Sequence, residues 1–404
     1  MKKACLLLTL LLCALLLCAC GTTAADPAEP TPSPTAAPTP TPFPEPVTEP
    51  GGEAWFDGHA LADGYRMKDG VACVRLSQVA EALGAELTQE GERFSFAWRK
   101  SRVKLTAGRA SARYLDQDRP LEAAPLLCAG GEDLLVPVKG LCDAAEIGFY
   151  DDAELNSLYC TPATGDWALE EGYAVPMLMY HMVDVYGSDD ANLIVRPDSL
   201  EEQFQWLLDN DFTPIWFEDL WHVEDFPKPV ILVFDDGYSD MYRYVYPLAE
   251  QYKIKVEIAL ITDSVEHNSD LYLNREQVLE MKDSPYISFQ SHSVSHPNLA
   301  ETWFVPDPEP ELRDSALYLM RLLKKAPVTF VYPSGGVTPT VQELVRQYYR
   351  FGVIMVGEPY VTGMDPTLMS RYFIERQTPL PWFAFWLNES LNHPELKNYC
   401  PREP

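Results

Sequence analysis

The chain has 404 residues, of which 47% are hydrophobic and 12% aromatic, a composition that supplies folded cores and excludes global disorder. This length is more than one core normally organises, so two domains are expected. The formal net charge is −29, from 31 basic and 60 acidic side chains. Because such an acidic body repels phosphate backbones, no nucleic-acid partner is expected.

The first twenty residues have the features of a bacterial export signal. Lys2 and Lys3 precede an almost uninterrupted apolar run over 4–19, which is too short for a membrane span. The run ends in Leu-Cys-Ala-Cys-Gly, which resembles a lipobox and makes Cys20 the predicted lipidation site. Residues 1–20 are therefore assigned to a lipoprotein signal peptide. We expect an exported protein, anchored through acyl chains to the outer face of the bacterial cytoplasmic membrane; simple secretion is the alternative.

A proline-rich linker is predicted over 21–54. Ten prolines fall between Pro27 and Pro50, interleaved with Thr, Ala, Ser and Glu. This composition forms no core and favours polyproline II. Either a stiff spacer that holds the folded part away from the membrane or a linker without a spacing role fits it.

Residues 55–166 are expected to form a small α+β module. A strand followed by a short amphipathic helix is predicted over 74–85 and again over 135–148, with a strand-rich stretch between them. The pattern resembles the copper amine oxidase N-terminal-like domain of exported bacterial proteins. No copper site is expected, because His59 is the only histidine of the segment and copper needs several imidazole or thiolate ligands. The resemblance implies a non-catalytic spacer or envelope-binding module.

The module also contains four cysteines for which no single state is predicted. Export permits disulfides, and four cysteines allow three connectivities. Buried free thiols are an equal alternative. These cysteines are Cys73, Cys128, Cys142 and Cys160.

Residues 170–395 alternate apolar β-rich runs with amphipathic helical stretches, which predicts an α/β architecture. The predicted strands cover 175–180, 230–234, 286–289 and 328–331. The predicted helices cover 199–210, 240–252, 275–282, 311–325 and 340–349. Active sites of α/β barrels are built where strands end, so the polar residues that follow these strands are expected to converge.

Those strand ends carry chemistry-bearing residues. His181 follows the first strand, Asp235 and Asp236 the second, and His292 and His296 the third. Each piece alone is a weak signal, and a His-Glu-x-x-His zinc motif is excluded because serine stands in the glutamate position. One carboxylate and two spaced imidazoles form a three-ligand set with an open position, as catalytic zinc requires. We therefore predict that Asp236, His292 and His296 bind a divalent metal, most consistent with Zn²⁺.

At these residues the chain resembles the NodB-homology polysaccharide deacetylases of carbohydrate esterase family four. Phe-Asp-Asp-Gly at 234–237 matches the first family motif, and Ser-His-Ser-Val-Ser-His-Pro at 291–297 the second. Tyr-Pro-Ser-Gly at 332–335 corresponds to the third motif without its usual arginine, and 175–181 looks like the opening strand of the poly-N-acetylglucosamine deacetylase branch. The resemblance covers roughly 173–380 and implies a deformed (β/α) barrel.

The resemblance also implies roles for individual residues. Asp235, next to a ligand, is the candidate general base. The family's late Leu-His motif is absent, so His181 becomes the candidate general acid. Arg371, which lies in the predicted late strand, is the candidate substitute for the missing arginine partner of Asp235. Arg371 is also a candidate substrate-binding residue, together with Tyr332, Pro333, Ser334 and Gly335, whose backbone N–H groups are the candidate oxyanion site.

The predicted function is metal-dependent removal of N-acetyl groups from an envelope or extracellular polysaccharide, such as peptidoglycan or poly-N-acetylglucosamine, with release of acetate. O-deacetylation of a polysaccharide is one alternative. A catalytically inactive glycan-binding lipoprotein is another, motivated by the missing arginine and late histidine. A two-histidine-one-carboxylate iron oxygenase is disfavoured by the motifs around the ligands. The expected partners are the glycan and the membrane, and the expected state is a monomer.

Overall fold

The computed structural model describes residues 44–161, 169–186, 192–267 and 269–400. The predicted signal peptide, Cys20 and most of the predicted linker lie outside these residues. None of the helices in the described part of the chain combines the length and the hydropathy that a membrane span requires.

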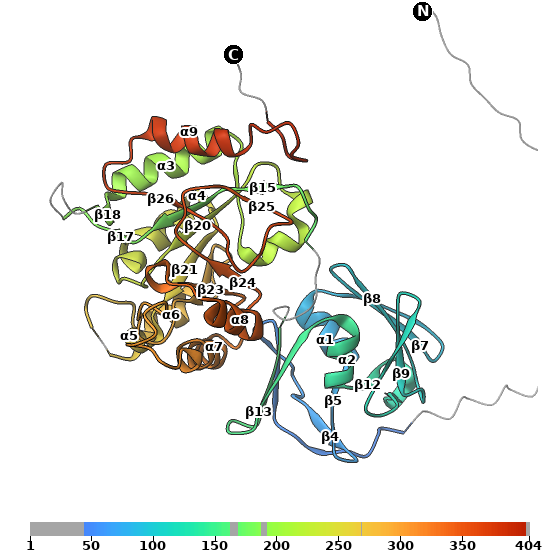
Figure 1. Cartoon of the computed structure of the whole chain (residues 1–404). Helices are drawn as coiled ribbons and strands as arrows, with labels where there is room; N and C mark the ends of the chain where they lie inside the picture. The colour runs from blue at the N-terminus through green and yellow to red at the C-terminus, as the bar shows by residue number, and fades with distance from the viewer. Residues whose placement is uncertain (1–43, 162–168, 187–191, 268, 401–404) are drawn as a thin grey trace, which may run out of the picture. The chain divides into compact units, whose positions relative to one another are not determined.

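The N-terminal module consists of three sheets and two short helices (Figure 1). Its helices are α1 (Leu76–Leu83) and α2 (Val138–Ala145). The strands are β1 (Glu49–Pro50), β2 (Glu53–Phe56), β3 (His59–Ala60), β4 (Arg66–Lys68), β5 (Val71–Arg75), β6 (Glu86–Glu90), β7 (Arg93–Trp98), β8 (Ser101–Thr106), β9 (Ser111–Tyr114), β10 (Gln117–Pro120), β11 (Leu126–Leu127), β12 (Leu134–Pro137), β13 (Gly148–Asp152) and β14 (Ser157–Thr161). The sheets have the orders β1-β4-β5-β12-β11, β10-β9-β8-β7-β6 and β13-β14-β2-β3.

The internal echo predicted from the sequence is a structural repeat of a strand followed by a helix. Strand β5 leads into α1 and β12 leads into α2, and the two strands pair antiparallel, with Val74 opposite Val136. The module begins earlier than predicted, because Glu49 pairs with Met67 of β4. Pro50 is tolerated there since β1 is an edge strand, where a missing N–H costs no ladder bond. Cys73, Cys128, Cys142 and Cys160 are buried free thiols, and Cys400 near the end of the chain is a half-buried one.

The C-terminal part is an α/β domain around a parallel sheet of order β24-β23-β22-β21-β20-β16-β26. The strands of this part are β15 (Ala174–Val175), β16 (Met177–Tyr180), β17 (Met182–Val183), β18 (Ile194–Val195), β19 (Thr213–Pro214), β20 (Pro229–Phe234), β21 (Val256–Leu260), β22 (Ile287–Ser291), β23 (Thr329–Val331), β24 (Phe351–Val353), β25 (Tyr360–Val361) and β26 (Tyr372–Phe373). Its α-helices are α3 (Pro197–Asp209), α4 (Tyr246–Tyr252), α5 (Thr262–Glu266), α6 (Arg275–Met281), α7 (Glu309–Leu323), α8 (Pro339–Tyr348) and α9 (Leu380–Ser390).

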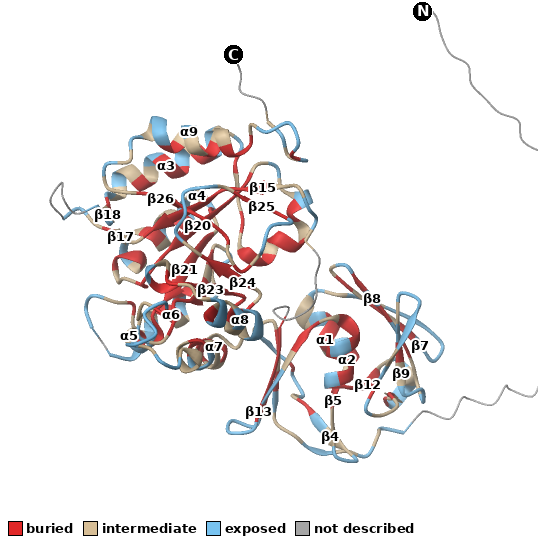
Figure 2. Cartoon of the chain, in the orientation of Figure 1, coloured by how far each residue is buried: buried red, intermediate tan, exposed pale blue. Residues whose placement is uncertain are grey.

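The central strands are apolar along their whole length because helices cover the sheet. All six residues of β20 and all five of β21 are buried, and Figure 2 shows the strands of this sheet as buried while the helices expose their outer faces. A parallel sheet covered on both faces requires such continuous apolar runs. This explains why the sequence signal for these strands is a run rather than an alternation.

A short segment over 369–373 links the two edges of the sheet. Met369 forms a parallel bridge with Val353 of β24, while Tyr372 and Phe373 pair with β16 at the other edge. The sheet is therefore curled into a deformed (β/α) barrel, which confirms the predicted fold class.

Most predicted elements of this domain are present, but strands β21 and β24 and helices α5 and α9 were not predicted, and one predicted helix differs in form. The predicted helix over 240–252 begins with a π-helical turn, Met241–Val245, before α4. Helix α9 was missed because its sequence is apolar on nearly all sides, without the one-sided pattern that marks a helix.

Candidate active site

Polar residues follow four strands of the sheet and meet at its carboxyl edge. His181 follows β16, Asp235 and Asp236 follow β20, His292 follows β22, and Tyr332 follows β23. The Asp235 N–H donates to the Tyr180 carbonyl at 2.8 Å, which ties the ends of two strands together. The edge that parallel strands create thus collects residues that are far apart in the chain, as in other α/β barrels.

Asp236, His292 and His296 form a compact group. The Oδ1 atom of Asp236 lies 3.4 Å from Nε2 of His292 and 3.4 Å from Nε2 of His296. One potential ligand atom from each residue lies within 4.8 Å of the others, and no second group of this kind occurs among the described residues. One carboxylate and two imidazoles that leave a fourth direction open are the donor set of a catalytic zinc site.

The donor atoms of this group are prepared to hold a cation. Asp236 Oδ1 is buried without a hydrogen-bond partner, a state that costs free energy unless a ligand satisfies it. The His292 Nδ1–H donates to the Val331 carbonyl at 2.7 Å, which leaves Nε2 as the free lone pair. Burial raises the pKa of Asp236, but His292, His181 and His296 outweigh burial and bring the pKa to about 2. The residues therefore fit a divalent metal.

The backbone around these ligands adopts conformations that most residues avoid. Asp236, Ser293 and His296 have positive φ angles of 72°, 67° and 61°. Such left-handed conformations of non-glycine residues cost free energy and cluster at functional sites. Gly237 also has a positive φ, and a Cβ there would lie 2.6 Å from Leu260 Cδ2, so the motif requires glycine at this position.

The loop that carries both histidines is held by a glutamate of helix α7. The N–H groups of Val294 and Ser295 each donate to Oε2 of Glu311 at 2.9 Å, and the Ser295 hydroxyl donates to Oε1 at 2.7 Å. Within the loop, the His296 N–H donates to the Ser293 hydroxyl at 2.9 Å. Sequence reasoning missed Glu311, because it looks like an ordinary first-turn acid of a helix.

Asp235 and Arg371 form a buried, two-pronged ion pair. Nη1 of Arg371 lies 2.7 Å from Oδ1 of Asp235, and Nη2 lies 2.9 Å from Oδ2. Both residues are almost completely buried, at 2% and 1% exposure. Burial raises the pKa of Asp235, but Arg371, His292 and His181 lower it more. The Asp235 carboxylate is therefore ionised and fixed in orientation beside the three candidate metal ligands.

Arg371 is placed by the segment that closes the barrel. It lies between Met369 and Tyr372, which bond to opposite edges of the sheet, and its Nε also donates to the Ile354 carbonyl at 3.4 Å. Three of the five guanidinium N–H groups bond to these protein oxygens. Arg371 is therefore a partner of Asp235, and its predicted contact with substrate stays a prediction.

His181 lies at the end of β16 with one ring nitrogen unpaired. Its Nδ1 is buried without a hydrogen-bond partner, and the ring packs edge-on against Phe373 at 5.7 Å between centroids. Burial lowers the pKa of His181, although Asp235 and Asp236 oppose this effect. The imidazole is therefore neutral near neutral pH and has an unpaired nitrogen.

Asp240, a second residue that sequence reasoning missed, holds the segment that follows His181. Its Oδ2 accepts the Val183 N–H at 3.0 Å, while Oδ1 is buried without a partner. Burial raises the pKa of Asp240 to about 7, with Asp184 adding to the rise and the Val183 bond and Arg243 opposing it. Nothing in the local sequence distinguishes this aspartate from a turn residue.

The turn over 332–335 offers fewer donors than predicted. The Tyr332 N–H donates to the Val353 carbonyl, Pro333 has no N–H, and the Gly335 N–H donates to the Tyr332 carbonyl. The side chains of Tyr332 and Pro333 are buried, and the Tyr332 hydroxyl donates to the Thr367 carbonyl. Among the described residues of this turn, Ser334 is the one whose backbone N–H has no hydrogen-bond partner. Ser334 is exposed and has a φ of 55°.

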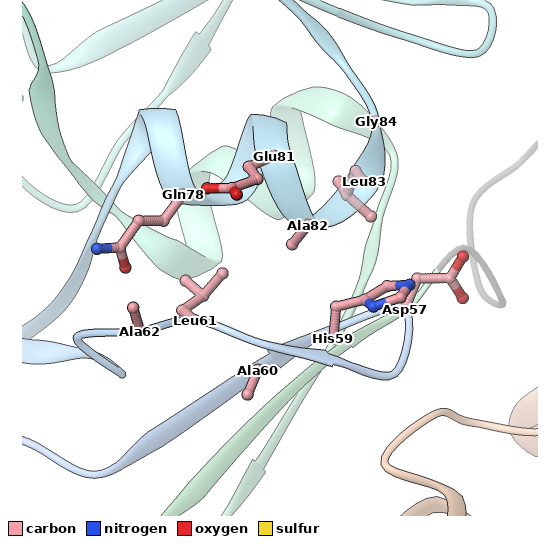
Figure 3. A pocket seen from close by; sticks show the side chains of 10 residues that line it. All are labelled: Asp57, His59, Ala60, Leu61, Ala62, Gln78, Glu81, Ala82, Leu83 and Gly84. Atoms are coloured by element: carbon pink, nitrogen blue, oxygen red, sulfur yellow. The ribbon is translucent and has the colours of Figure 1, made fainter. Parts of the chain in front are cut away.

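A separate cavity lies within the N-terminal module (Figure 3). It has a volume of about 590 Å³ and is lined by Asp57, His59, Ala60, Leu61, Ala62, Gln78, Glu81, Ala82, Leu83 and Gly84. Figure 3 shows the His59 ring beside Asp57, with Gln78 and Glu81 projecting from α1. None of these residues belongs to the candidate metal group of the described chain. The chemistry-bearing residues therefore lie in the C-terminal domain.

Comparisons with known proteins agree with this location. The family model described as Polysaccharide deacetylase matches residues 222–350, which include Asp235, Asp236, His292 and His296 but neither His181 nor Arg371.

Three relatives extend this match. The Bacillus subtilis protein named "Putative polysaccharide deacetylase YxkH" is 29% identical over 231 residues, which are 55% of this chain and 78% of that protein. The Escherichia coli poly-beta-1,6-N-acetyl-D-glucosamine N-deacetylase is 31% identical over 81 residues, which are 19% of this chain and 12% of that protein. The structure of the Streptococcus pyogenes deacetylase PplD in complex with acetate is 29% identical, covers 54% of this chain and 99% of that one, and has a TM-score of 0.50. Together these findings support a NodB-type polysaccharide deacetylase domain and indicate that the chain is an enzyme, a hydrolase.

Proposed function

We propose that this chain, which carries a polysaccharide deacetylase domain, removes N-acetyl groups from an N-acetylglucosamine-containing polysaccharide of the cell envelope or its surroundings, with release of acetate. The observation that carries the proposal is the pairing of two unlike carboxylates. Asp236 has a buried, unpaired oxygen facing two imidazoles, while its neighbour Asp235 is locked onto Arg371. Adjacent carboxylates in different environments fit the separate roles of metal ligand and base.

Asp236, His292 and His296 would hold the divalent metal, for which Zn²⁺ fits the donor set. When bound, this cation polarises the amide carbonyl and makes water a better nucleophile. Asp235, which lies beside these ligands, would take the proton from the attacking water. Arg371 keeps the pKa of Asp235 low, so the carboxylate is ionised before the reaction and can accept a proton. Because it is a weak base, it also releases that proton easily.

The leaving amine needs a proton before the C–N bond can break. His181 is the residue we assign to this step, because its Nδ1 is unpaired at the same edge of the sheet. The pKa of His181 is lowered, so its imidazole is neutral when the reaction begins. It must therefore receive a proton before it can protonate the amine. The proton that Asp235 takes from water is the source we assign. The Ser334 N–H is the donor we assign to the carbonyl oxygen as negative charge develops there.

Arg371 removes one reason for the inactive alternative. The missing arginine of the third motif suggested a barrel without turnover, yet the Asp235 carboxylate is fully paired. O-deacetylation remains the chemical alternative, since an ester offers the same carbonyl.

The supporting relatives are named for polysaccharide deacetylation and, in one case, for poly-beta-1,6-N-acetyl-D-glucosamine. We further propose export and lipid anchoring at Cys20, which rest on the sequence alone. The test is acetate release by purified residues 21–404 from N-acetylglucosamine oligomers, peptidoglycan and poly-N-acetylglucosamine, with acetylated xylan as the ester substrate and with bound metal measured in parallel. Release from none of the amide substrates would overturn the proposal.

A further inference from the structure

Two aromatic side chains stand exposed on the loop that follows the second histidine ligand. Trp303 is 76% exposed and Phe304 is 64% exposed, and their rings contact each other with centroids 3.6 Å apart and planes inclined by 38°. Large aromatic side chains normally bury their rings, and exposed apolar patches mark interaction sites. We therefore expect the two rings to form part of a binding surface.

The pair is held in place rather than left on a fraying loop. Leu299 on one side is buried, and Val305 on the other packs into the same apolar cluster, which also contains Tyr332. The N–H groups of Phe304 and Val305 donate to the Glu301 carbonyl at 2.9 and 3.0 Å. The backbone is thus anchored on both sides, and only the two rings project outward.

The loop begins at His296, a candidate metal ligand. Trp303 is seven positions further along the chain, so the two Cα atoms are at most about 25 Å apart. Near its start, the Asn298 side chain lies against Gly336, where a Cβ would come within 2.0 Å of Oδ1. The loop that carries the pair is therefore anchored beside the turn over 332–335, within reach of a chain molecule bound at the metal ligands.

Other exposed apolar side chains lie in connecting segments of the same domain. They are Val185 and Tyr186 after β17, Leu193 before β18, Leu271 between α5 and α6, and Met355 and Val356 after β24. Glu301 and Asp307, exposed acids on either side of the aromatic pair, keep the loop polar. A flat ring surface flanked by polar groups suits a ligand that has both apolar faces and hydroxyl edges.

We propose that Trp303 and Phe304 form a subsite for a sugar ring of the polysaccharide chain, away from the unit that loses its acetyl group. A pyranose presents C–H bonds on its faces, and these pack on the negative face of an aromatic ring by dispersion and quadrupole attraction. This inference rests on the proposed function and adds a preference for long chains. A single N-acetylglucosamine unit at the metal ligands has no second ring to place on the pair, whereas an extended oligomer has.

The test compares short and long substrates in the Trp303→Ala/Phe304→Ala double variant. For a long N-acetylglucosamine oligomer we expect KM to rise about tenfold with kcat unchanged, because a remote contact contributes uniform binding. For the disaccharide we expect no change in either constant. The matched control is Trp382→Ala, which removes a 56% exposed tryptophan from helix α9 and should alter neither substrate.

Three outcomes decide the matter. An unchanged KM for the long oligomer would overturn the subsite, as would an equal loss for both substrates, which indicates damage to the active site. Concentration-dependent dimers of wild type that the double variant abolishes would overturn it too, since the face then pairs with a second copy. If wild type releases no acetate, the proposed function fails, and the subsite is tested separately by calorimetric binding of the oligomer to wild type and the double variant.

Discussion

Replacement of Arg371 by Gln tests the link between barrel closure and the candidate base. The change removes a guanidinium that makes two bonds to Asp235, of 2.7 and 2.9 Å, and leaves that carboxylate buried without a counter-charge. Removing one partner of a buried ion pair costs about 3–5 kcal/mol of unfolding free energy. This is a large part of the roughly 5–15 kcal/mol that stabilises a domain.

Arg371→Lys separates charge from geometry. Lysine keeps a positive charge but cannot bond both carboxylate oxygens, so we expect a smaller loss, about 1.5–3 kcal/mol for one charge-assisted hydrogen bond. Turnover should fall in both variants, because the orientation of Asp235 depends on the two-pronged contact. The expected order of stability is therefore wild type, then Arg371→Lys, then Arg371→Gln.

The assay is urea unfolding followed by fluorescence, with acetate release measured on the same samples. The matched control is Arg346→Gln, which breaks an ion pair with Asp365 of similar length, 2.8 Å, in which both side chains are about 40% exposed. Exposed pairs contribute at most about 1 kcal/mol. The reasoning is refuted if Arg371→Gln unfolds at the same urea concentration as the Arg346→Gln control.

Three further predictions concern the residues around this pair. Asp236→Ala should lose bound metal, whereas Asp235→Asn should keep it and lose turnover, as measured by metal analysis and acetate release. Glu311→Ala should weaken metal binding about tenfold, because residues that orient ligands contribute 10–100-fold, as measured by competition with a chelating dye. Asp240 has a folded pKa of about 7, above its unfolded value, because burial penalises the charged form. Wild type should therefore lose stability as the pH rises from about 4 to 7, by no more than about 4 kcal/mol, and Asp240→Asn should abolish this loss while still accepting the Val183 N–H.

Each of these predictions has a defined contrary result. Equal metal loss in Asp236→Ala and Asp235→Asn would show that both carboxylates are ligands. For Glu311, the control is Glu343→Ala on helix α8, an exposed glutamate whose removal should leave metal affinity unchanged; the same affinity in both variants contradicts the assigned role. A stability difference between wild type and Asp240→Asn that stays constant from pH 4 to 8 would show that Asp240 remains ionised.

Most strands of the sheet and the candidate ligands could be predicted because their signals are local. A buried parallel strand reads as an apolar run, and the first polar residues after it must lie at the carboxyl edge of the sheet. Asp235 and Asp236 follow the apolar run of β20, and His292 follows β22. To predict that these residues converge, it was enough to know that the carboxyl ends of parallel strands lie at the same edge of the sheet.

The remaining contacts depend on tertiary packing that a sequence does not encode locally. Arg371 meets Asp235 across 136 residues, and Glu311 reaches the histidine loop from a helix that begins after it. The donors of the turn over 332–335 could be counted only after their acceptors were known, which left Ser334 as the free N–H. These contacts form only when the barrel closes and brings distant segments together. The sequence of a single segment therefore does not predict them.

Barrel closure also explains how the site keeps a paired Asp235 without an arginine in the third motif. An arginine on the turn over 332–335 would approach Asp235 from a loop, whereas Arg371 comes from a segment whose backbone bonds to both sheet edges at Met369 and Tyr372. A buried charge pair needs fixed geometry to offset its desolvation, and a segment bonded on both sides provides that geometry. Substitutions that loosen the closing segment should therefore lower stability and turnover together.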